Sequence, residues 1–399
     1  MAGAFRVTPR EGPAIEILIV GASARAAAWS ALRAGLRPLA ADLFADRDLT
    51  AIAATRSLER SRYPWSGLDL ARAHKKVPAL YSGALENHPE FLEALASDRP
   101  LWGNSGAVVR AVRDPFRLNA LLHEAGLLSP RVAVSREQTD RRVRWLIKPL
   151  RSAGGLGVHF DDGRPLRPTH YLQEFIEGPS LGAIFVSRPE DIVFLGASRM
   201  LLEPGRFAYR GSVGPLALHG PFLEALLRLG ERIARGFGLK GLFGVDCVER
   251  DGRPWPVEVN PRYTASVEVL ELATGRSALS EHRAAFDPTG RSFQGPPAGM
   301  VAKEVLRAGR DFAFPCLDWA PPGPNDAWKV PEVADLPHEG EPFRRGDPVL
   351  TVFGEGRLVE EAVTQLEARR SQWAARLGWR LDHDVDQAHL RGPCARHHV

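Results

Sequence analysis

The sequence predicts an α/β region at the N-terminus, an α+β region in the middle and a small β-rich part at the C-terminus. The first observation is an apolar strand at 15–20, a glycine turn, an Ala-rich helix and a second strand at 37–42, which begin a βαβ unit. The second is a hairpin within 240–266, where β-rich flanks surround Asp251 and Gly252. The third is a set of strand-like runs among Pro- and Gly-rich turns near the C-terminus.

Composition narrows the class of protein. A chain of 399 residues is long enough for two or three domains, and 44% hydrophobic with 25% charged residues is typical of a globular protein. The net charge of +4 comes from scattered arginines, which suits small anionic substrates better than nucleic acid. No apolar run approaches the roughly 18 residues of a membrane helix, and the N-terminus lacks the apolar core of a signal peptide. Three widely spaced cysteines are typical of free thiols, so a cytoplasmic protein is expected.

The N-terminal strand, turn and helix leave two interpretations open. They suggest dinucleotide binding, but Gly21, Ala22 and Ser23 do not reproduce the GxGxxG spacing. The alternative is a doubly wound domain that binds no nucleotide, in which the helix N-terminus at Ser23 could hold a carboxylate or phosphate. Residues 46–99 continue the same α/β pattern.

A helix is predicted from Arg113 to Ser129. Asp114 suits its N-cap, Pro115 its first turn, and Gly126 the position past its end.

A glycine-rich loop follows a strand at 144–149. The strand carries Lys148, and Gly154, Gly155 and Gly157 lie in the loop after it. Glycines let backbone N–H groups approach phosphates closely, and a lysine supplies a point charge. The stretch is not a Walker loop, and a plain glycine-rich turn is the alternative.

The remaining elements are predicted from alternation and helical spacing. They are strands at 171–176, 183–187, 192–197 and 206–213, and helices at 221–237, 267–286 and 359–377.

The central hairpin raises a question of register. A two-residue turn would pair Asp246 with Val257 and separate Asp246 from Glu258. A three- or five-residue connection would place the two carboxylates directly opposite each other. We expect the second arrangement, in which facing carboxylates repel unless a cation lies between them.

Asp246, Glu258 and the amide oxygen of Asn260 are hard oxygen ligands of the kind that hold Mg²⁺ against nucleotide phosphates. Arg262, further along the same face, suits a developing negative charge on a phosphoryl group. The alternative is an ordinary half-exposed hairpin whose polar residues face solvent.

The string D-x(11)-E-x-N-x-R, with Pro261 after the asparagine, resembles the metal-binding end of the ATP-grasp superfamily. The resemblance implies that Asp246, Glu258 and Asn260 hold magnesium, with Mn²⁺ as an alternative ion, and that Arg262 lies beside an acyl phosphate. It covers roughly residues 15–290.

The same resemblance extends to two earlier segments. Lys148 and the glycine loop (Gly154, Gly155, Gly157) match the strand lysine and flexible loop of the family. Residues 171–179 are similar to its adenine hinge, which implies backbone contacts near Gln173, Glu174, Phe175 and Ile176.

Two positions depart from the family pattern. Pro115 stands where many members carry a helix lysine that touches phosphate, and either Arg113 or Arg117 could replace that charge. Ser180 stands where many carry an acid for the ribose.

The resemblance implies four segments. Residues 1–110 are expected to form a Rossmann-like pre-ATP-grasp domain, and 111–290 an ATP-grasp fold of two α+β subdomains with the nucleotide and metal site. Residues 291–380 are expected to form a small β-rich module with a terminal helix. The end, 381–399, holds His383, His389, Cys394, His397 and His398, and fits a loose terminus better than a metal site.

The expected activity is ATP-dependent ligation of a small carboxylate to an amine through an acyl phosphate, releasing ADP. The early GASARAA and late GDPVLTVF pieces are similar to ATP-grasp proteins of methanofuran- and tetrahydromethanopterin-linked one-carbon metabolism, which implies glutamate ligated to a small amine. Partners are expected to be these substrates, without nucleic acid or membrane, and a homodimer is allowed. A nucleotide-binding regulator without turnover is the main alternative, and a dinucleotide oxidoreductase is the other.

Overall fold

The computed structural model describes residues 16–379. The histidine-rich end that the sequence assigned to a loose terminus lies outside this range.

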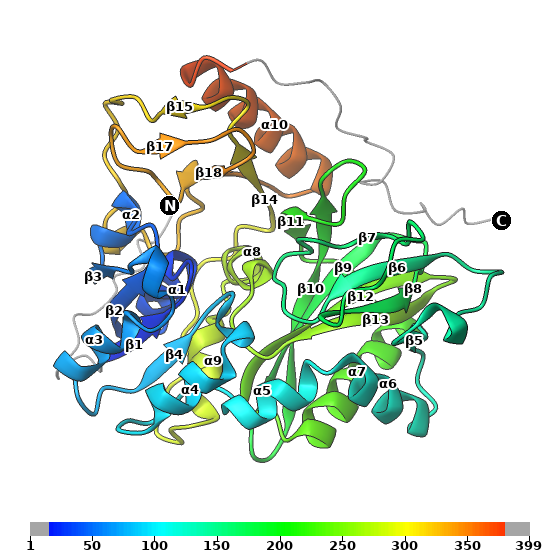
Figure 1. Ribbon diagram of the computed structural model, residues 1–399. Helices are drawn as coiled ribbons and strands as arrows, with labels where there is room; N and C mark the ends of the chain where they lie inside the picture. The colour runs from blue at the N-terminus through cyan, green and yellow to red at the C-terminus, as the bar shows by residue number, and fades with distance from the viewer. Residues whose placement is uncertain (1–15, 380–399) are drawn as a thin grey trace, which may run out of the picture.

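The N-terminal region is a parallel sheet flanked by helices, as predicted (Figure 1). The strand order is β3-β2-β1-β4. The strands are β1 (Glu16–Val20), β2 (Arg37–Asp42), β3 (Ala54–Ser57) and β4 (Ala79–Tyr81). The helices are α1 (Arg25–Arg33), α2 (Arg47–Thr50), α3 (Gly67–Ala73) and α4 (Pro89–Ala96). Four successive residues of β1, 17–20, are fully buried, as expected for a central parallel strand covered on both faces.

A small antiparallel sheet comes next, in the order β5-β8-β6-β7. Its strands are β5 (Val132–Ala133), β6 (Trp145–Pro149), β7 (His159–Phe160) and β8 (His170–Glu174). Helices α5 (Gly106–Val112) and α6 (Pro115–Glu124) lead into it. The Asp114 carboxylate accepts hydrogen bonds from the backbone N–H groups of Phe116 and Arg117, which confirms the predicted N-cap. The helix is shorter than predicted because the chain turns at Gly126, whose φ is 66°.

The third sheet has eight antiparallel strands in the order β13-β12-β9-β10-β11-β14-β18-β16. Its strands are β9 (Ser180–Ser187), β10 (Ile192–Leu202), β11 (Tyr209–Gly214), β12 (Gly241–Arg250), β13 (Arg253–Asn260), β14 (Met300–Arg307), β16 (Val333–Ala334) and β18 (Pro348–Gly356). A separate two-stranded ribbon pairs β15 (Phe312–Ala313) with β17 (Pro342–Phe343). The C-terminal strands therefore continue the sheet that carries the central hairpin.

Helices cover both faces of this sheet (Figure 1). They are α7 (Gly220–Phe237), α8 (Ala265–Thr274), α9 (Ala278–Ala284) and, over the C-terminal strands, α10 (Val359–Arg376). Strand β9 shows the division: Phe185 packs in one core with Leu229 of α7, while Ile184 packs in another with Leu270 of α8. The single helix predicted at 267–286 is wrong, because the left-handed Gly275 ends α8 and a new helix begins beyond it.

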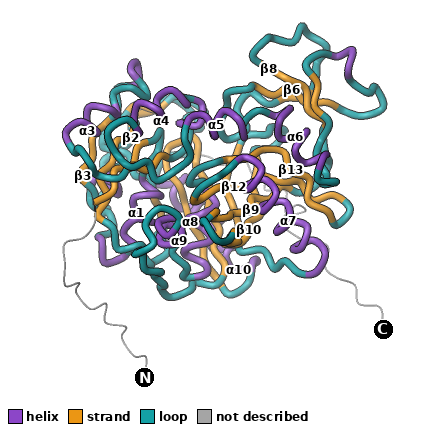
Figure 2. The backbone as a smooth tube through the Cα atoms, turned by 90° about the horizontal axis from the view of Figure 1, so that it is seen from below, coloured by secondary structure: helices purple, strands orange, loops and turns teal. Residues whose placement is uncertain are grey.

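The N-terminal region is tied to the sheet by buried polar contacts. Tyr81 donates its hydroxyl hydrogen to the carbonyl of Pro261 at 2.8 Å. Asn104 bonds the backbone of both Lys240 and Pro261. These contacts place β4 beside the end of the central hairpin, and Figure 2 shows the small sheet of β6 and β8 projecting from the other side. No described helix is long and apolar enough to cross a membrane.

Candidate nucleotide and metal site

The central hairpin combines a two-residue turn with a bulge. Asp251 and Gly252 both have positive φ, 53° and 66°, and Arg250 pairs directly with Arg253. The register then shifts between Asp246 and Cys247, so that Asp246 lies opposite Glu258. The predicted pairing of the acids is confirmed, whereas the predicted longer connection is wrong.

The bulge explains why both findings hold. Cys247 pairs with Pro256 and Asp246 with Glu258, which leaves Val257 as the extra residue of β13. β13 is the edge strand of the sheet, where proline and bulges are tolerated because fewer ladder hydrogen bonds are lost. Val257 lines the cavities described below and is not part of a core cluster.

The two facing carboxylates are paired unequally: Glu258 forms an ion pair with Arg113, whereas no described cation lies within ion-pair distance of Asp246. Burial, together with the charge of Glu258, raises the pKa of Asp246 from its usual value to about 7. The Asn260 amide donates to Asp246 Oδ2 at 2.9 Å, and its Oδ1 accepts from Arg262 at 3.1 Å. In the described part of the chain, no group of three or more His, Cys, Asp or Glu side chains could hold a metal ion by itself. A divalent cation here would need further oxygens, which nucleotide phosphates and water supply.

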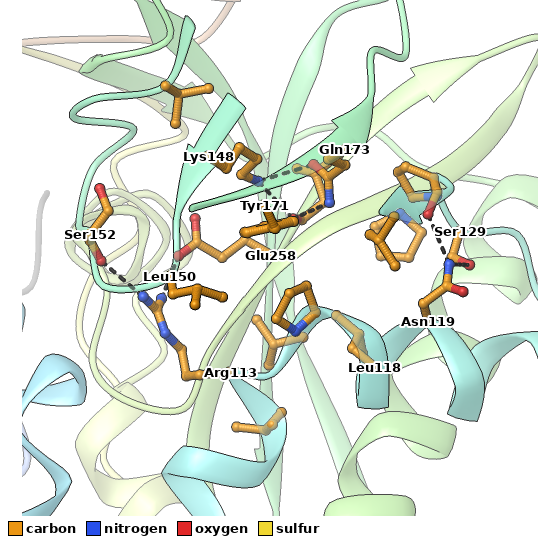
Figure 3. A pocket seen from close by; sticks show the side chains of 18 of the residues that line it. Arg113, Leu118, Asn119, Ser129, Lys148, Leu150, Ser152, Tyr171, Gln173 and Glu258 are labelled. Carbon is orange, nitrogen blue, oxygen red and sulfur yellow. Dashed lines mark hydrogen bonds and ion pairs between the residues drawn. The ribbon is translucent and has the colours of Figure 1, made fainter. Parts of the chain in front are cut away.

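Arg113 lies at this site. Its guanidinium pairs with Glu258 and donates to the carbonyl of Ser152, at the start of the glycine loop, at 2.9 Å (Figure 3). Arg117 is exposed. Of the two arginines that the sequence left open, the structure places Arg113 beside the carboxylates, at the junction of α5 and α6.

Lys148 points into the same space from β6. Its Nζ donates to Gln173 Oε1 at 3.0 Å and to the Val257 carbonyl at 3.1 Å, and Figure 3 shows these contacts above Glu258. Lys148 therefore bridges the small sheet and the hairpin, and hydrogen bonds to both fix the position of its ammonium group.

A cavity of about 360 Å³ lies between the small sheet and the hairpin, large enough for a small-molecule ligand. The sequence-predicted residues that line it are Lys148, Gly154, Gly155, Gln173, Glu174, Phe175, Ile176, Asp246, Glu258, Asn260 and Arg262. Gly157 is the one predicted residue outside this lining, and Ser180 lies within it. A smaller cavity, shown in Figure 3, adjoins it and shares Lys148 and Glu258.

The two ends of the large cavity differ in chemistry. The carboxylates and Arg262 make one end polar, while Phe175, Phe207, Met200 and Leu202 line an apolar part. Sequence reasoning missed Met200, Leu202 and Phe207. They lie on β10 and the loop after it, which come close to segment 171–179 only when the large sheet has formed. No local pattern marks them.

Glu174 of the hinge-like segment 171–179 and Gly155 of the glycine loop present main-chain atoms to the cavity. The Glu174 side chain turns away to Arg131, with Nε and Oε2 2.9 Å apart, so its main chain is the part left toward the cavity. Gly155 has a φ of 73°, and a Cβ there would lie 1.9 Å from the carbonyl oxygen of Phe207. Both the backbone conformation and the close approach therefore require glycine at this position.

Arg262 joins the polar end to the N-terminal region. It pairs at 2.5 Å with Glu86 of the short 3₁₀ helix η2 (Leu85–Asn87). Burial acts to raise the pKa of Glu86, but the charge of Arg262 holds it below its usual value. Within the described residues, Glu86 Oε2 and Arg262 Nε have no hydrogen-bond partner. Sequence reasoning missed Glu86, which lies 176 residues away along the chain.

Comparisons with known proteins agree with this geometry. A family model described as an ATP-grasp domain matches residues 112–266. A solved structure of N5-carboxyaminoimidazole ribonucleotide synthetase bound to ADP superposes with a TM-score of 0.66 at 14% identity, over 93% of this chain and 100% of that one. An L-amino acid ligase from Bacillus licheniformis gives 0.63 at 15% identity, over 90% and 98%.

A curated relative is an uncharacterized protein of Methanocaldococcus jannaschii, 27% identical over 227 residues. The match covers 53% of this chain, which spans about half (51%) of that protein. The chain therefore carries an ATP-grasp domain, and the resemblance drawn from its motifs is confirmed.

Proposed function

We propose that the protein is an ATP-dependent ligase that joins a small carboxylate to an amine through an acyl phosphate. The observation that carries this proposal is the face-to-face pair of Asp246 and Glu258 beside Arg262, at the polar end of a cavity whose other part is apolar. A purely structural hairpin would gain nothing from two facing carboxylates. The ligase names of the structural neighbours support the same class of reaction.

The nucleotide is proposed to lie with its base among Phe175, Ile176 and Phe207 and its phosphates toward Lys148. Backbone groups at Glu174 and Ile176 would pair with the base, since the Glu174 side chain is engaged elsewhere. Glycines 154 and 155 would bring backbone N–H groups close to the phosphates. Lys148, held by Gln173 and Val257, supplies a fixed positive charge to them.

The residues present fit a divalent cation, because Asp246 and Glu258 face each other with a raised pKa on Asp246. These two carboxylates would hold Mg²⁺, or Mn²⁺ in its place, with Asn260 as a third ligand once its amide oxygen is released from Arg262. Such an ion neutralises phosphoryl oxygens when bound. Arg113 is paired with the Glu258 carboxylate in this structure. Breaking this ion pair would free the guanidinium and the carboxylate for the nucleotide.

Arg262 is proposed as the catalytic residue that stabilises the acyl phosphate and the oxyanion formed on amine attack. Its planar guanidinium is fixed by Glu86, so it meets the developing charge without reorganisation. Glutamate as the carboxylate and a small amine of one-carbon cofactor synthesis as the nucleophile remain the specific proposal.

The test is release of ADP and phosphate from ATP with Mg²⁺, using pools of amino acids and small amines. ADP release that requires both a carboxylate and an amine is expected. ATP binding without turnover under every pool would favour the nucleotide-binding regulator and count against the ligase. Mass spectrometry of the mixture would then identify the amide. Its mass would show whether glutamate or another carboxylate was joined to the amine.

A further inference from the structure

A second cavity, of about 210 Å³, lies on the opposite side of α8 from the nucleotide cavity. It is bounded by α1, by α8 and by the C-terminal segment 319–334. Ser266 lines the nucleotide cavity and Glu268 lines this one. Two residues along a helix differ by about 200° in direction, so α8 separates the two spaces. The two cavities share no lining residue, and Figure 1 shows α8 between the N-terminal region and the large sheet.

The walls of this cavity are aromatic. Trp29 of α1 and Trp319 of the C-terminal segment line it, together with proline and valine side chains. Trp319 packs edge-on against the buried Trp373 of α10, with ring centroids 6.1 Å apart, so its indole is held in place. Fixed indole faces attract cations through their negative quadrupole.

The cations that line the cavity already have carboxylate partners. Arg25 pairs with Glu268 and, at 2.8 Å, with Asp335. Arg33 pairs with Glu271 at 2.9 Å. Lys329 pairs with Asp326 at 2.5 Å. An anionic ligand would therefore meet no uncommitted positive charge among these residues.

The carboxylates outnumber the cations. The lining holds Asp48, Glu268, Asp326 and Glu332 against Arg25, Arg33 and Lys329. Asp48 shares Arg25 with two other carboxylates and lies 3.6 Å from it. Glu332 accepts a hydrogen bond from Trp373 Nε1 at 2.9 Å, and no described Lys, Arg or His forms an ion pair with it. The cavity thus presents excess negative charge beside aromatic faces.

We propose that this cavity is a second ligand site, which binds a small organic cation: a protonated or quaternary amine on an apolar body of about the size of one aromatic ring. The apolar body packs between Trp29 and Trp319, and the cationic group lies near Glu332 and Asp48. Because α8 separates this ligand from the nucleotide, it is not the reacting amine. Its binding does not depend on the proposed ligase activity.

The experiment is calorimetric titration of the full chain with three matched probes: benzylamine, benzyl alcohol and benzoate. Benzylamine is expected to bind at least about tenfold more tightly than either of the others, the effect of one charge-assisted contact plus a cation–π contact. It is also expected to bind with one site per chain, with and without saturating ATP and Mg²⁺. Equal affinities for the three probes, or displacement of benzylamine by ATP, would overturn the proposal.

Two variants test the assigned residues. Glu332→Gln keeps an oxygen acceptor for Trp373 but removes the charge, and Trp319→Ala removes one wall. Each is expected to weaken benzylamine binding about fivefold or more, while Glu190→Gln and Trp65→Ala, at exposed positions, leave it unchanged. If Glu332→Gln, folded by its thermal melt, binds benzylamine with unchanged affinity, the site is not the one proposed.

Discussion

Two acidic groups, the buried Glu268 and the half-buried Asp246, lie on either side of the start of α8, and their charges are balanced in opposite ways. Glu268 receives ion pairs from Arg25 and, at 2.9 Å, from Lys303. Burial acts to raise the pKa of Glu268, but these two cations hold that pKa well below its usual value. Asp246 faces a second carboxylate instead, and its pKa is raised to about 7. Glu268 is therefore paired with cations of the fold, while no described cation lies within ion-pair distance of Asp246.

The comparison separates structural from functional charge. A buried carboxylate whose cations come from the protein is costly to alter, since its loss leaves those cations unpaired. A buried carboxylate opposed by another carboxylate destabilises the folded state, and such a pair is expected where a ligand supplies the missing charge. The following variants measure this difference.

Glu268→Gln is expected to have the largest effect. It would leave Arg25 and Lys303 buried with less compensating charge, and should lower the free energy of unfolding by about 3–5 kcal/mol. Urea denaturation followed by circular dichroism measures this, with the exposed Glu190→Gln as the control. A loss below about 1 kcal/mol would show that the Glu268 network does not stabilise the fold.

Arg262→Lys should separate catalysis from binding. Lysine can keep one contact to Glu86 but cannot reproduce the fork, so turnover should fall roughly 10²-fold while ATP affinity stays within a few-fold. Initial rates of ADP release and calorimetric ATP titration measure the two quantities. Arg117→Lys, at an exposed position of α6, is the matched control. Normal turnover in Arg262→Lys would mean that the residue only joins the hairpin to η2.

Lys148→Ala tests the lysine that lines the large cavity. Loss of a charge-assisted contact to phosphate should weaken ATP binding by about 1.5–3 kcal/mol. Lys240→Ala, at an exposed position before β12, should leave the affinity unchanged. An unaltered dissociation constant in Lys148→Ala would assign the glycine loop a purely structural role.

Asp246→Asn should have the smallest effect on folding, and its sign should be opposite to that of Glu268→Gln. Removing one of two facing charges should raise the free energy of unfolding without Mg²⁺ by about 1–2 kcal/mol. The same variant should lose the Mg²⁺-dependent part of ATP binding, as should Glu258→Gln in large measure. A destabilised Asp246→Asn would indicate that the hairpin carboxylates are structural after all.

The segments that sequence reasoning located best are those whose pattern is local. The βαβ start, the N-cap at Asp114 and the strand that carries Lys148 were predicted within a few residues of their observed bounds. The pairing of Asp246 with Glu258 was predicted for a chemical reason, but the turn was misjudged. A bulge at Val257 restores the pairing. A single sequence does not indicate where an edge strand contains an extra residue.

The sequence by itself therefore determined the order of the elements and the ATP-grasp resemblance, and eleven of the twelve predicted site residues line one cavity. These follow from short-range spacing, because a strand or loop carries its own residues to one face. Only the tertiary structure decided which distant groups complete the site: Glu86 against Arg262, Arg113 against Glu258, and Phe207 against the hinge. Such contacts depend on how three sheets pack together, and that arrangement is set by burial of side chains along the whole chain.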